Sequence, residues 1–217
     1  MGKRMAAWVV AWALVAAVGG ASGAEKLPTG KLVDAVSVLV KGVSSRAGTE
    51  AELLADFQGT ANTGLFNAAD EAALALDDAI AALRRIDASA RPQVASTSLA
   101  YLKAAQNLVK SLHDARRKAA HAQVLDREGA KAVADLKAAK DSDRPPLLEH
   151  MEKVFGQNDE AEAAMKESVT RSISALAELE LRRGLLAAQL GSSDALVPEK
   201  TLAAVKRGLQ AVQPQEE

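Results

Sequence analysis

Residues 145–190 read PPLLEHMEKVFGQNDEAEAAMKESVTRSISALAELELRRGLLAAQL. The apolar side chains of this stretch recur at alternating steps of three and four residues, which is the spacing of one face of an α-helix. The double proline favours a helix start, and Gly191 with the serines after it favours a stop. We therefore predict one long helix whose apolar face, here called the inner seam, packs against another helix. The inner seam consists of Met151, Phe155, Met165, Val169, Leu176, Leu179, Leu186 and Leu190.

Polar residues interrupt the inner seam. The same register turns four of them inward, namely Asn158, Glu162, Ser172 and Arg183. Such interruptions more often fix the alignment of packed helices than mark a binding site. A helix break at Gly156 is left open, because Asp159 followed by Glu162 resembles a capping box that starts a new helix.

The rest of the chain shows the same pattern. Pro92 can begin a helix that continues to about Lys140, on the order of 70 Å at 1.5 Å per residue. Residues 28–90 form an earlier arm, in which Thr49 and Glu52 make another capping box. The segment from Gly59 to Gly64 is expected to be a kink or loop in that arm. A last short helix is expected near Pro198, with an apolar side formed by Leu202, Val205, Leu209 and Val212.

These patterns predict an all-α fold. We expect an elongated antiparallel bundle of three long helices, residues 28–90, 92–141 and 146–190, plus a short C-terminal helix. One domain would span residues 25–212, followed by a polar tail at 213–217. Alanine accounts for 47 of the 217 residues, and cysteine is absent. Stability must therefore come from buried aliphatic area, without disulfides.

The first 24 residues have the layout of a signal peptide. A basic start precedes an apolar run at residues 6–18, which is well short of the roughly 20 residues that a membrane span needs. Small residues predict cleavage between Ala24 and Glu25, with a cut after Ala21 as the alternative. We expect a soluble mature protein that is secreted, displayed at the cell surface, or periplasmic in a bacterium. Membrane association is expected only if a C-terminal anchor lies beyond this sequence.

The charge and the aromatic content of the chain limit the classes of partner that we expect. Cleavage would leave 25 basic residues against 28 acidic ones, a net charge of −3. Nucleic-acid binding is not expected, because it needs a strongly basic face. The aromatic residues that would remain are too few to predict stacking sites for bases, sugars or haem, and they are Phe57, Phe66, Tyr101 and Phe155. The partner is unknown and the oligomeric state is open.

No motif indicates catalysis or a metal. His113 and His121 lie two helical turns apart, too far to share a metal, and with His150 they are interpreted as surface residues. Asp141 and Asp143 are interpreted as turn residues. The basic pairs and the run Arg116-Arg117-Lys118 are interpreted as solvated, because consecutive helical residues point about 100° apart; the pairs are Arg84-Arg85 and Arg182-Arg183. Glycine-rich phosphate loops, nucleophile elbows and Asn-linked glycosylation sites are absent from the sequence. We predict no catalytic residue, no cofactor and no metal.

The mature chain resembles the insect-stage alanine-rich and glutamic acid/alanine-rich surface coat proteins of trypanosomes. The resemblance lies in the alanine-rich composition and the layout of long helices from Glu25 to about Val212. It implies packed helices that stand away from a membrane as a coat, and the related haptoglobin-haemoglobin receptors carry a binding surface on such a bundle. The leading hypothesis is a non-enzymatic exported surface or interaction protein. The alternatives are a secreted receptor or carrier for a protein or apolar ligand, and a bacterial periplasmic chaperone or envelope protein.

Overall fold

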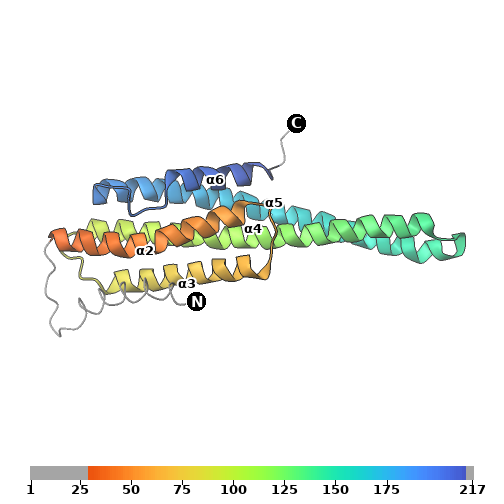
Figure 1. Cartoon of the computed structure of the whole chain (residues 1–217), viewed down its shortest axis with the longest axis horizontal. Helices are drawn as coiled ribbons and strands as arrows, with labels where there is room; N and C mark the ends of the chain where they lie inside the picture. Colours follow the sequence, from red (N-terminus) through yellow and green to blue (C-terminus); the bar gives the residue numbers. More distant parts are fainter. Residues whose placement is uncertain (1–28, 214–217) are drawn as a thin grey trace.

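The computed structural model describes residues 29–213, and this part of the chain is helical (Figure 1). Helices contain 86% of it and strands none, which confirms the all-α class for the described residues. The predicted signal peptide, the cut between Ala24 and Glu25, and the tail beyond Gln213 lie outside the described residues.

Five α-helices and one short 3-10 helix make up the described chain. They are α2 (Thr29–Ala55), α3 (Thr63–Arg85), α4 (Pro92–Ala138), η1 (Asp141–Asp143), α5 (Arg144–Leu190) and α6 (Glu199–Gln210). α4 and α5 contain 47 residues each, so each is about 70 Å long. Figure 1 shows α5 returning alongside α4 after η1, while α2, α3 and α6 cover only one half of this pair.

Proline and glycine mark the helix ends as predicted. Pro92 occupies the first turn of α4, and Pro198 directly precedes α6. Gly191 ends α5 with a φ of 73°, a left-handed conformation that costs glycine little because it has no Cβ.

The first predicted arm, residues 28–90, is two helices, and the expected kink or loop is a loop at residues 56–62. The residues between α2 and α3 reverse the chain, and the side chain of Asn62 caps α3 by accepting a hydrogen bond from the Leu65 N–H at 2.9 Å. The predicted capping box at Thr49 is wrong, because Thr49 lies inside α2 and its hydroxyl donates to the Ser45 carbonyl at 3.1 Å. That bond satisfies the hydroxyl without breaking the helix.

The helix break that the sequence leaves open at Gly156 does not occur. α5 continues through Gly156, and both Asp159 and Glu162 lie in its interior. Val154 and Ala161 are buried on either side of the glycine. Packing on both sides therefore holds the helix together where the local sequence favours an end.

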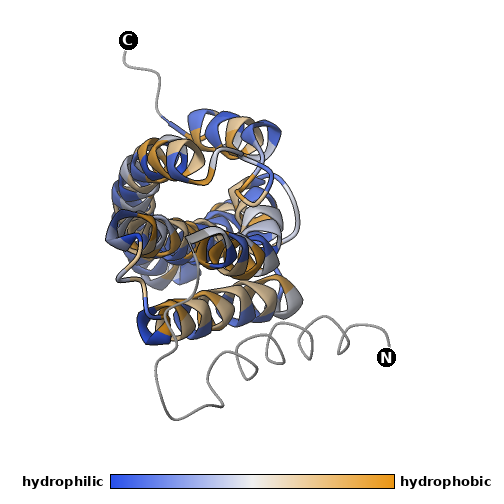
Figure 2. Cartoon of the chain, turned by 90° about the vertical axis from the view of Figure 1, so that its left-hand side faces the viewer, coloured by the Kyte–Doolittle hydropathy of each residue, from blue (hydrophilic) through white to orange (hydrophobic). Residues whose placement is uncertain are grey.

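Buried apolar side chains from all five helices form one main core, and Figure 2 shows these helices gathered around it in a view along the molecule. Tyr101 on α4 belongs to this core and is fully buried. Its hydroxyl bonds to the Ser44 hydroxyl of α2 and accepts from the Val197 N–H, both at 2.9 Å. Burial raises the pKa of Tyr101. Arg183 of α5 donates to the Val197 carbonyl at 2.8 Å, so hydrogen bonds tie this buried residue before α6 to both α4 and α5.

The inner seam of α5 is buried along only part of its length. Val169, Leu176, Leu179 and Leu186 are buried, as is the polar residue Ser172, and Met151, Met165 and Leu190 are partly buried. Phe155, predicted to face inward, is 41% exposed. Among the described helices, α4 alone lies beside that part of α5, and it is too narrow to cover a phenylalanine (Figure 1).

α6 approaches α2 so closely that Gly208 has no room for a side chain, since an added Cβ would collide with the Ala55 carbonyl oxygen. We expect Gly208→Ala to separate α6 from α2 and to lower the free energy of unfolding by about 1–3 kcal/mol, the range for overpacked sites. Chemical denaturation gives the stability, and hydrogen exchange over residues 199–210 reports the release of α6.

Gly42→Ala is the matched control, because Gly42 lies in α2 with open space around its Cβ position. That substitution should stabilise the chain by about 0.5–1 kcal/mol. Equal stability changes in the two variants would contradict the close contact at Gly208.

Candidate functional site

The distal half of the α4–α5 pair extends beyond the other helices (Figure 1). We call residues 119–165 the projecting hairpin. It projects because α2 has only 27 residues, about 40 Å of helix, whereas α4 has 47. The loop between α2 and α3 reaches α4 at Arg116, and past that level α4 and α5 extend beyond the other described helices.

The projecting hairpin has a thin core of its own. Ala122, Leu125 and Ala161 form a small buried cluster separate from the main core. Gly129 of α4 leaves space for the Phe155 ring, since an added Cβ would lie 3.0 Å from that ring. Small residues bring two helices close together but cover little area, so three large apolar side chains remain exposed on the hairpin. They are Val124, Leu148 and Phe155, with exposed fractions of 55%, 41% and 41%.

Polar contacts align the two helices of the hairpin. The side-chain amide of Asn158 donates to Asp126 at 2.8 Å. His150 Nε2 lies 3.9 Å from a carboxylate oxygen of Glu128, an ion pair when the histidine is protonated. These contacts fix which residues of α4 and α5 lie side by side.

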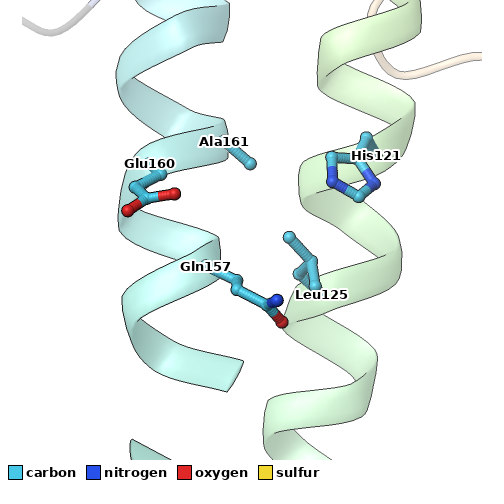
Figure 3. Close-up of a pocket in the computed structure, with 5 residues that line it drawn as sticks. All are labelled: His121, Leu125, Gln157, Glu160 and Ala161. Atoms are coloured by element: carbon cyan, nitrogen blue, oxygen red, sulfur yellow. The ribbon is translucent and has the colours of Figure 1, made fainter. Parts of the chain in front are cut away.

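A shallow groove of about 360 Å³ lies between α4 and α5 on the hairpin (Figure 3). Its lining residues are His121, Leu125, Gln157, Glu160 and Ala161. Figure 3 shows the Gln157 side chain extending from α5 toward Leu125 on α4. The groove therefore combines a small apolar floor with groups that donate and accept hydrogen bonds.

Arg116 is buried at the base of the hairpin, so its interpretation as a solvated residue is wrong. It is the largest fully buried side chain of the described residues, while its neighbour Arg117 is exposed. The guanidinium donates to the Phe57 carbonyl at 2.7 Å and to the Gly59 carbonyl, and lies 5.6 Å from the centre of the Phe57 ring. Burial lowers the pKa of Arg116, and the charge of Asp56 opposes this shift. Arg116 therefore fastens the α2–α3 loop to α4.

Four polar residues, here called the polar clasp, join α4 to α5 at the same level: Asp114, Lys118, Ser168 and Arg171. One carboxylate oxygen of Asp114 accepts from Lys118 at 2.9 Å, from Ser168 at 2.8 Å and from Arg171 at 3.0 Å. Burial by itself would raise the pKa of Asp114. The hydrogen bonds from Lys118 and Ser168 and the charges of Lys118 and Arg171 outweigh it, so the pKa is lowered.

Ser168 and Lys118 are paired as in enzymes that use a serine nucleophile with a lysine base, because the ammonium lies 2.7 Å from the hydroxyl. The Ser168 side chain is only 1% exposed and sits inside α5. A carbonyl carbon has no room beside the hydroxyl, and the neighbouring backbone N–H groups are engaged in helical hydrogen bonds. The hydroxyl therefore serves as a fixed link between the two helices.

The histidines occupy separate places. His121 and His150 are exposed on the hairpin. His113 was predicted at the surface, but its side chain is only 19% exposed, and its ring meets the Phe66 ring edge to face at 5.2 Å. Phe66 of α3 covers His113, so the predicted surface position is wrong. Within residues 29–213, no group of three His, Asp or Glu side chains could hold a metal, and no helix is long and apolar enough to cross a membrane.

We expect Arg116→Ala to lower the free energy of unfolding by about 3 kcal/mol, because two carbonyls lose charged donors and one is left unpaired in the interior. Arg117→Ala is the matched control on the exposed side and should change stability by less than about 0.5 kcal/mol. Arg116→Lys should fall between them, since an ammonium does not reproduce the two-pronged contact. Equal denaturation midpoints for the two alanine variants would show that Arg116 has no such role.

Asp114 should make stability depend on acid pH. Because its pKa is lowered in the folded state, its contribution is complete above the ordinary value of 3.8 and is lost as the pH falls below that value. We expect Asp114→Asn to lower the Tm above about pH 4 and to flatten the fall of Tm at lower pH. Asp78→Asn, at an exposed position on α3, should keep the wild-type slope. A parallel slope in Asp114→Asn would contradict the polar clasp.

Comparison with known proteins gives no relative: no family model, curated protein or solved structure matches this chain.

Proposed function

We propose that this chain is a non-enzymatic exported protein that presents the projecting hairpin to a protein partner. The single observation that supports this function is the hairpin itself, which carries exposed Leu148, Phe155 and Val124 beyond the helices that cover the rest of the molecule. Exposed large apolar side chains are costly in water, and a partner surface that covers those of the hairpin recovers that cost.

The way the hairpin is held supports presentation. Arg116 fastens one side of its base and the polar clasp the other, so the hairpin leaves the bundle in a fixed direction. A fixed hairpin loses less conformational entropy on binding than a loose one. The proposal also includes the arrangement of the helices. They act as one elongated antiparallel bundle that sets the hairpin at a distance from its base, as a surface coat or interaction module requires.

A receptor or carrier is the second candidate, and the groove beside His121 and Gln157 favours it. This alternative predicts a saturable rise in Tm with the ligand, whereas a coat protein shows none. A bacterial periplasmic chaperone or envelope protein would use the same signal peptide and the same exposed hairpin, and differs in the compartment where it is found. The resemblance to trypanosome coat proteins remains a prediction from composition and helix layout.

The test uses the full chain in cells that produce it. Protein recovered outside the cytosol should begin at Glu25, as N-terminal sequencing would show. The chain has no cysteine, so a single cysteine can carry a photo-crosslinker at a chosen site. We expect Leu148→Cys on the hairpin to give a discrete crosslinked product with another protein.

Leu53→Cys is the control, because Leu53 is 51% exposed on α2, away from the hairpin. Equal products at the two positions, or none at Leu148, would contradict presentation by the hairpin. Retention of an uncleaved chain inside the cytosol would contradict export.

A further inference from the structure

The C-terminal half of α5 has a second uncharged face. We call it the outer α5 face, and its residues are Ser174, Ala177, Leu181, Gly184, Leu185 and Ala188. All six are exposed, including Leu181 at 56% and Leu185 at 47%. At 100° per residue this face points away from Leu179 and Leu186, which are buried against the core. The same length of helix therefore carries two apolar faces on opposite sides.

A solvated helix face in this protein usually carries charge, because a quarter of all residues are Asp, Glu, Lys or Arg. The outer α5 face has none over about four turns. An added Cβ at Gly184 would meet nothing within 4 Å, so nothing within the fold requires a small residue there. Two exposed leucines beside alanine and glycine give ridges and hollows of the kind that lets two helices pack closely.

The charged residues beside the outer α5 face indicate which partner binds to it. Glu178 and Arg182 flank it on one side, and Arg182 Nε already donates to Glu178 at 2.7 Å. The two residues lie at equal distances from position 180. In an antiparallel pair centred there, Glu178 meets Arg182 of the second copy, and Arg182 meets Glu178 of that copy, so the flank is complementary to itself.

We propose that the outer α5 face binds a second copy of this chain, with the two α5 helices antiparallel and a two-fold axis near residues 180 and 181. Leu181 then lies next to the axis, and Leu185 packs against Ala177 of the second copy. Only about 20 Å of each helix takes part, so the dimer is weak and depends on concentration. This proposal is independent of the function of the projecting hairpin.

Sedimentation of the chain from Glu25 onward, over micromolar to millimolar concentrations, tests the dimer. Leu181→Lys should shift the equilibrium toward monomer by at least tenfold in Kd. Leu74→Lys is the control, since Leu74 is 64% exposed on α3 and lies outside this face. A wild-type chain that stays monomeric, or equal shifts in the two variants, would overturn the proposal and leave the face to a different protein.

Charge exchange tests the partner. Glu178→Arg and Arg182→Glu should each weaken the dimer, because like charges then meet across the axis. The double variant should restore it, since the exchange returns opposite charges to both contacts. Circular dichroism of each variant checks that helix content is unchanged. Single variants with wild-type affinity, or a double variant no better than either, would overturn the assignment.

Cysteine crosslinking tests the orientation, because the chain has no cysteine of its own. Leu181→Cys should form a disulfide-linked dimer on mild oxidation. Ala188→Cys should not, because the two copies of residue 188 lie roughly 24 Å apart along antiparallel helices. Crosslinking at both positions would indicate a parallel pair and would reject the proposed geometry, as would crosslinking at neither.

Discussion

The packing of α5 along α4 is the contact on which the other features depend, and it is the most extensive contact between helices in the described chain. Each helix is about 70 Å long, far beyond what α2, α3 and α6 can cover. Where α2, α3 and α6 add their side chains, the pair has a deep core around Tyr101. Beyond Arg116 the buried side chains of the pair are few and mostly small, with Leu125 and Val154 as the larger ones, and Phe155 stays 41% exposed. The projecting hairpin is thus a direct result of unequal helix lengths.

The change from thick bundle to thin hairpin needs polar contacts as well as apolar ones. A loop that reverses the chain leaves backbone carbonyls without helical partners, and at residues 57 and 59 those carbonyls face the core side of α4. Arg116 satisfies both with one planar guanidinium. On the other side of α4, one oxygen of Asp114 collects three donors, two of them from α5. Directional bonds fix both the rotation and the sliding of α5 on α4, which interchangeable small residues would leave loose.

Much of the helical layout could be predicted from the sequence, because the spacing of apolar residues and the positions of proline and glycine are local properties. Pro92, Gly191 and Pro198 mark helix ends by backbone geometry alone. Local signals misled at Thr49 and Gly156, where packing on both sides overrides a weak start or stop. The candidate site was harder to predict. The spacing of Asp114 and Lys118 is visible in the sequence, but Ser168 and Arg171 join them from 50 to 57 residues away.

Arg116 and Phe155 show two further limits of pattern reading. A run of three basic residues does not tell how exposed each of the three is. Successive helical side chains point 100° apart, so one can be buried while its neighbour is solvated. The spacing of apolar residues also shows which side of a helix faces a partner, but it does not show how wide that partner is. The width of the partner decides whether Phe155 is covered.

Both limits apply to α5, where two faces share the three-and-four spacing. Their side chains differ in size: leucine and valine dominate the buried face, while the outer α5 face mixes two leucines with alanine, serine and glycine. A core needs the buried area that large side chains supply, so size assigns the inner seam to the core. The small side chains on the other face allow the close approach that a second helix requires.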